Sequence, residues 1–212
     1  YLLVFFLTAK RLYHPLALYF VVLLEMIALV YFWKNRENKN EGNGFDPNKT
    51  IHKVKQFFAS RPLMYNVLLL AACGVIAFYL FIFFYFLGTV FEHWDPVTGW
   101  NRFAVDWSSN RFLTNTWRYP QLIPANWSVS YVLMGTTMVH AFAKAIMPLF
   151  ALGNLLLFFD LGLRKRSSVY FLGLVFCGGL LMYLYNPSYV ASGYMDIPVS
   201  FFGFLAFHAL YT

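Results

Sequence analysis

The sequence predicts an all-α integral membrane protein: one membrane domain over residues 1–212, built as a polytopic helical bundle with about four complete transmembrane spans. The chain is 60% hydrophobic and 12% charged, and its mean hydropathy is +0.56. An ordinary soluble domain carries about 25% charged residues. Apolar runs of bilayer length alternate with polar segments that hold most of the charges. Such a chain cannot cover a water-facing surface, so its main solvent is the lipid bilayer.

The first complete span is expected at residues 16–33, after the break that Pro15 makes. At 1.5 Å per residue, this run matches one bilayer thickness. Glu25 lies near its middle. A carboxylate in hydrocarbon is costly, so it faces a polar partner or cavity, or it is a protonated, hydrogen-bonded packing residue. Residues 1–7 and the run from Ile197 onward are apolar at the chain ends, which predicts truncated end helices.

Residues 34–62 form a polar linker that contains a predicted surface helix. Asp46 followed by Pro47 is a typical helix start, with the aspartate as N-cap and the proline in the first turn. Downstream, apolar residues fall on one helical face and lysines surround the other. The pattern predicts an amphipathic helix on the membrane surface. Its apolar residues are Ile51, Val54, Phe57 and Phe58.

Three more spans are predicted from apolar runs at residues 63–91, 127–161 and 169–185. The second of these is the longest, and Gly135 and Pro148 interrupt it. It is therefore expected to be either one kinked helix or a helix followed by a re-entrant piece.

The distribution of basic residues orients the predicted bundle. Most lysines and arginines lie in the 34–62 linker and in the 164–166 turn, which two spans separate. Basic loops stay in the cytoplasm, so both segments are placed on that side. The net charge of +7 is explained in the same way, and no nucleic-acid partner is expected. Residues 92–126 and 186–196 then share the extracytoplasmic side.

Residues 92–126 are predicted to form a folded extracytoplasmic cap, named here the cap segment. The stretch from 91 to 127 holds five of the six tryptophans. Tryptophan concentrates where hydrocarbon meets headgroups, so the segment is expected to lie on one membrane face. These tryptophans are Trp94, Trp100, Trp107, Trp117 and Trp127.

A candidate metal site lies at the start of the cap segment, where Glu92, His93 and Asp95 occur together. Carboxylate and imidazole are suitable ligands for copper, zinc or iron. The alternative is a cluster of hydrogen bonds that orders the loop without any metal.

Polar residues inside the predicted spans suggest two further functions. His140 and Lys144 are four residues apart and share a helix face. An acid from another helix, such as Glu25, would have to meet Lys144, and the three could serve a small-solute or ion transporter. Alternatively, both side chains extend toward the interface. His140 and His208 could instead bind haem b as axial ligands in an electron-transfer anchor.

Several segments resemble, in order, the C subunit of the copper membrane monooxygenases, the particulate methane and ammonia monooxygenase family. They are WKNRENK at 33–39, FDPNKTIHKVKQFF at 45–58, YFLGTVFEHWDPVTGWNRFAVDWS at 85–108 and IPVSFFGFLAFHAL at 197–210. The resemblance implies an integral subunit of a hetero-oligomeric oxidoreductase complex in a bacterial inner membrane, either plasma or intracytoplasmic. It implies contact with lipid and with other membrane subunits, and copper as a cofactor.

The metal ligands of that family are mostly not matched. The family pattern is an aspartate followed by two histidines, and only Asp95 fits, because Gly99 or Asn101 stands where the first histidine is expected. A later family site would begin near Asn186, yet no histidine follows before Ser200. The resemblance therefore implies the fold and the membrane complex more than a working copper site.

Overall fold

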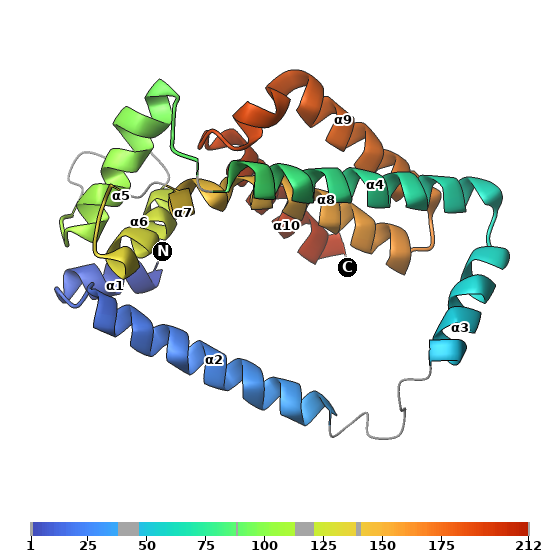
Figure 1. Cartoon of the computed structure of the whole chain (residues 1–212), viewed down its shortest axis with the longest axis horizontal. Helices are drawn as coiled ribbons and strands as arrows, with labels where there is room; N and C mark the ends of the chain where they lie inside the picture. Colours follow the sequence, from blue (N-terminus) through green and yellow to red (C-terminus); the bar gives the residue numbers. More distant parts are fainter. Residues whose placement is uncertain (1, 38–46, 88, 113–120, 139–140, 212) are drawn as a thin grey trace.

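The computed structural model describes residues 2–37, 47–87, 89–112, 121–138 and 141–211. Every regular element in these ranges is a helix (Figure 1). The all-helical class predicted from the sequence is thereby confirmed.

A bundle of four helices forms the larger part of the molecule, with α9 packed against both α4 and α8 and with α10 against α8 (Figure 1). Its core contains Tyr79, Leu155 and Phe171, all fully buried. The Tyr79 hydroxyl donates a hydrogen bond to the Gly178 carbonyl at 2.9 Å. A Cβ at Gly178 would lie 2.5 Å from the Val75 side chain, so the absent side chain permits close approach of α4 and α9. The helices are α4 (Leu63–Phe86), α8 (Met147–Arg164), α9 (Ser168–Val190) and α10 (Asp196–Tyr211).

Helix α9 bends near its end, at Asn186 and Pro187. Asn186 has a φ of 30° and Pro187 follows it. Proline removes a backbone donor and its ring clashes with the preceding turn, so the helix cannot continue straight. The Asn186 side chain accepts a hydrogen bond from the Tyr189 backbone N–H at 3.1 Å, which starts the short final turn.

Where the structure describes it, the cap segment is largely helical and packs on the N-terminal helix. It contains a π-helical turn, η1 (Asp95–Trp100), then α5 (Asn101–Ser108), with α6 (Leu122–Met134) beginning at its end. Helix α1 (Leu2–Ala9) joins it through an apolar cluster that includes Val4, Trp107 and Val132.

The tryptophans of this region divide between core and surface. Trp107 and Trp127 are buried, and the Trp127 ring lies 4.5 Å from the Phe91 ring, centroid to centroid. Trp94 is 78% exposed, while Trp117 lies outside the described residues. Trp107 and Trp127 therefore serve packing, one in the cap segment and one directly after it, rather than contact with headgroups.

The apolar run at 127–161 is not one kinked helix, because two breaks divide it into three helices. Helix α6 ends at Gly135, whose φ of 65° is the left-handed conformation that glycine adopts without steric cost. Helix α7 (Ala141–Ala145) is a single short piece. Helix α8 then starts with Pro148 in its first turn, a position where proline is tolerated.

Helix α2 (Pro15–Glu37) leads away from the rest of the chain (Figure 1). Leu18 near its start packs into the cluster of α1 and the cap segment, and Tyr19 donates a hydrogen bond to the Leu133 carbonyl at 3.2 Å. All side chains from 22 to 35 are exposed. Among the described residues, this helix thus packs against the rest of the chain only near its start.

Helix α3 (Pro47–Ala59) occupies the predicted amphipathic stretch of the linker and begins at the proline. Phe57 and Phe58 pack against the core of the bundle. The Arg61 guanidinium lies 3.9 Å from the centre of the Phe57 ring and 4.5 Å from that of Tyr65. These contacts fix the end of α3 against the start of α4.

Within the described residues, three helices are long and apolar enough to cross a membrane: Pro15–Asn35, Leu63–Phe86 and Ala143–Arg164. Ser168–Leu184 and Asp196–Tyr211 are apolar but shorter. The membrane class is thus supported by three helices, whereas a fourth complete span at 169–185 stays a prediction.

Aromatic contacts join the elements at two ends of the bundle. At one end, the Tyr65 and Phe171 rings, 5.2 Å apart, join the starts of α4 and α9. At the other, His93 of the cap segment lies 4.9 Å from Tyr189 and 5.5 Å from Tyr194, measured between ring centres. Residues 186–196 therefore lie against the start of the cap segment.

Candidate functional site at the junction of cap segment and bundle

Lys144 is a buried cation at the junction between the cap segment and the bundle. Its side chain is 4% exposed. The Nζ atom donates a hydrogen bond to the Val90 carbonyl at 2.6 Å and lies 5.6 Å from the centre of the Phe86 ring. Its acid is Glu92, with Nζ and Oε1 4.0 Å apart, so Glu25 does not supply the ion pair suggested from the sequence. The lysine ties α7 to the end of α4.

The three candidate metal ligands take separate surroundings. Glu92 is 71% exposed and extends toward Lys144. The His93 ring packs on tyrosines of the 186–196 loop. Asp95 is exposed at the start of η1. Since Glu92 and His93 are neighbours in irregular backbone, nothing in the local structure turns their side chains to one point.

Among the residues that the structure describes, no three histidine, cysteine, aspartate or glutamate side chains gather closely enough to hold a metal ion. Glu92, His93 and Asp95 all belong to that part of the chain, so they do not form the three-ligand cluster expected from their spacing. Their arrangement resembles the alternative, a set of contacts that orders the start of the cap segment.

Aromatic rings organise the junction around His93. The Tyr189 and Tyr194 rings are stacked, with centres 5.1 Å apart and planes 7° from parallel. Burial, a hydrogen bond with Tyr189 and the negative charges of Asp95 and Asp196 raise the pKa of the Tyr194 phenol. The Tyr194 phenol therefore stays neutral at physiological pH. The Asp95 and Asp196 carboxylates thus lie near the stacked rings of Tyr189 and Tyr194.

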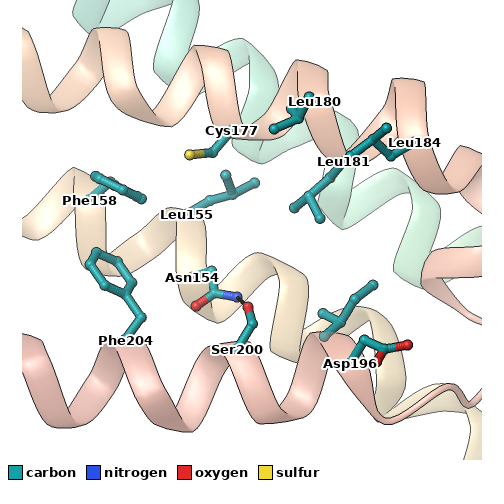
Figure 2. A pocket seen from close by; sticks show the side chains of 11 residues that line it. Asn154, Leu155, Phe158, Cys177, Leu180, Leu181, Leu184, Asp196, Ser200 and Phe204 are labelled. Carbon is teal, nitrogen blue, oxygen red and sulfur yellow. Dashed lines mark hydrogen bonds between the residues drawn. The ribbon is translucent and has the colours of Figure 1, made fainter.

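A cavity of about 330 Å³ lies between α8, α9 and α10 (Figure 2). Its wall is mostly apolar, and Asn154, Ser200 and Asp196 are its polar members. The Asn154 Nδ2 donates a hydrogen bond to the Ser200 Oγ at 3.1 Å. Helices α8 and α10 come together closely beside this pair, because a Cβ at Gly153 would lie 2.5 Å from the Phe201 ring.

His208 lies near the opposite end of the bundle from Lys144. Its Nε2 is 3.2 Å from the Asp160 carboxylate, which also pairs with Arg164 at 2.8 Å. This imidazole nitrogen therefore already faces a carboxylate. His140 lies outside the described residues, so the haem-ligand pair of His140 and His208 stays a prediction.

Glu25 lies on the exposed stretch of α2. No ion pair or hydrogen bond within the described residues connects it to Lys144. His140, the third residue proposed for transport, lies outside the described residues.

Sequence reasoning missed three polar contacts. Asn154 and Ser200 belong to apolar runs, and no sequence pattern predicts that α8 and α10 bring them together. No sequence pattern indicates the contacts of Tyr13. Its buried hydroxyl is 2.7 Å from the Ser128 Oγ, and its backbone exchanges two hydrogen bonds with the Asn110 side chain. A lone polar residue inside an apolar run is the signal that points to Asn154.

No protein-family model matches this chain, and neither a curated protein nor a solved structure matches it significantly.

Proposed function

We propose that this chain is an integral membrane subunit of a larger hetero-oligomeric membrane complex, of the copper membrane monooxygenase type. Its cap segment and the 186–196 loop then face the extracytoplasmic side, and α3 with the 164–166 turn faces the cytoplasm of a bacterial inner membrane. The basic residues of the linker and of that turn support this orientation.

Helix α2 carries the proposal. It is long and apolar enough to span a membrane, yet its side chains from 22 to 35 contact little of this chain. Glu25 lies in the middle of that exposed stretch. A lone carboxylate facing hydrocarbon is costly, whereas a polar side chain of a second subunit would satisfy it. A neighbouring subunit packed along α2 therefore accounts for both observations.

The type of complex rests on the sequence resemblance in the linker, at the cap junction and in the last helix. The resemblance does not extend to the histidine ligands of that family. We therefore assign the chain a structural role in such a complex, and we place no copper ligands on Glu92, His93 and Asp95.

Purification from native membranes tests the proposal. The tagged full chain, extracted in mild detergent, should migrate as an assembly larger than itself and should copurify with other membrane subunits. Glu25→Gln should reduce the recovered assembly while the chain itself stays folded. Glu92→Gln, an exposed acid outside the spans, is the matched control and should assemble normally.

The proposal fails if the wild-type chain is recovered alone, or if Glu25→Gln assembles as well as the wild type. A visible spectrum and metal analysis of the same preparation separate the competing classes. A Soret band would favour the haem anchor, and a complex without either haem or copper would remove the monooxygenase type.

A further inference from the structure

The cavity between α8, α9 and α10 has the composition of a ligand site. At about 330 Å³ it falls at the lower end of the range for small-molecule pockets, which are mostly apolar with a few placed polar groups. Its apolar wall includes Leu155, Phe158, Leu181 and Phe204. A wall of this kind accepts an aliphatic chain.

One polar atom in this wall lacks a partner. Asn154 is 9% exposed, and its Oδ1 has no hydrogen-bond partner among the described residues. Figure 2 shows this oxygen directed to the side of Phe204, while the amide nitrogen points to Ser200. A buried carbonyl oxygen is normally paired, because leaving it without a donor destabilises the folded chain. The cavity therefore offers an acceptor to a ligand that carries a donor.

The charged side chain that lines the cavity indicates which donor group the ligand carries. Asp196 lines the cavity and is exposed, so its carboxylate lies at the mouth. It also sits in the first turn of α10. No lysine, arginine or histidine belongs to the lining within the described residues. A fatty-acid carboxylate would thus meet like charge and no donor cation.

We propose that this cavity binds a single-chain aliphatic amine, with the chain among the leucines and phenylalanines. The ammonium group donates to the Asn154 Oδ1, and the Asp196 carboxylate lies at the mouth of the same cavity. An ammonium suits this site because it offers three donors and no acceptor. The site is independent of the proposed assembly, because α8, α9 and α10 supply all its residues.

Photolabelling of the purified full chain in a neutral maltoside detergent tests the site. The probe is octylamine with a diazirine on its chain, and the comparison probe is octanoate with the same diazirine. Labelled peptides are identified by mass spectrometry. We expect the amine probe to label peptides of α8 and α10 around Leu155 and Phe204, and unmodified octylamine to displace it.

Variants at the acceptor complete the test. Asn154→Leu keeps the approximate side-chain volume and removes the acceptor, so it should weaken octylamine binding about tenfold, the equivalent of one hydrogen bond. Asn154→Asp keeps an acceptor and should retain binding. Ser109→Ala, an exposed change in the cap segment, is the control, and thermal unfolding of each variant shows whether it folds.

Three results would overturn the proposal. The first is equal labelling of the cavity by the octanoate probe. The second is unchanged octylamine binding by folded Asn154→Leu. The third is labelling that falls outside α8, α9 and α10. If Asn154→Leu does not fold, loss of octylamine binding in folded Asn154→Asp refutes the acceptor role instead.

Discussion

Replacing Lys144 with methionine tests whether the junction of cap segment and bundle is held by a buried cation. Methionine keeps an unbranched apolar stem and removes the ammonium group. The variant loses the 2.6 Å hydrogen bond from Nζ to the Val90 carbonyl, and a hydrogen bond from a charged donor contributes about 1.5–3 kcal/mol. Glu92 adds little, because its 4.0 Å ion pair involves a carboxylate that is 71% exposed.

We therefore expect Lys144→Met to lower the free energy of unfolding by about 2 kcal/mol. For a chain of this size, that corresponds to a fall in Tm of about 4–8 °C. Thermal unfolding of the purified full chain in detergent, followed by circular dichroism, measures the shift. Glu92→Gln is the matched control and should change Tm by no more than about 2 °C.

The double variant separates the two contacts. If the Val90 bond dominates, Glu92→Gln should change Tm equally little in the wild type and in Lys144→Met, whereas an important ion pair would make its effect larger in the wild type. A wild-type Tm in Lys144→Met, or an equal loss in Glu92→Gln, would refute the assignment of the junction to the buried hydrogen bond.

Three further predictions concern the two ends of the molecule. Tyr13→Phe removes the buried contact with Ser128 and should cost about 1 kcal/mol of stability, seen as a lower Tm; Tyr31→Phe, at an exposed tyrosine of α2, should cost nothing measurable. In a background without the two native cysteines, Asn43→Cys and Ser109→Cys should be labelled by impermeant maleimide from opposite sides of the membrane, and labelling from one side would reject the orientation. His93→Ala should leave the bound metal of a native, unchelated preparation unchanged and loosen the cap segment to proteolysis; loss of stoichiometric metal would instead restore a metal site there.

The helices of the bundle were predictable because hydropathy and helix-ending residues are local signals. The apolar run from residue 63 became α4, Pro47 begins α3, and the Asn186-Pro187 pair ends the straight part of α9. In each case the deciding information lies within a few residues of the boundary.

Other features depend on contacts between distant segments, which local patterns do not encode. Hydropathy alone cannot show that Gly135 adopts a left-handed conformation, so the break between α6 and α7 was uncertain. The partners of Lys144 lie in the segment that follows α4, and tertiary packing brings them to the lysine. Trp127 is amphipathic and suits either an interface or a core, and the fold places it in a core.

Closely spaced ligand types were also an insufficient guide to a site. Glu92, His93 and Asp95 lie within four residues of one another, but side-chain directions in irregular backbone follow no period. Asn154 and Ser200 are far apart in sequence, and two packed helices bring them within hydrogen-bond distance.

Among the described residues, α2 packs only near its start, so it can tilt about that end. It has 23 residues, so at 1.5 Å per residue it is about 34 Å long. A tilt of about 10° at the end held by Leu18 and Tyr19 would therefore move the linker end by about 6 Å. Such a swing also shortens or lengthens the apolar span along the bilayer normal. A change in the tilt of α2 can therefore fit its apolar length to bilayers of different thickness. The packing of α4, α8, α9 and α10 need not change.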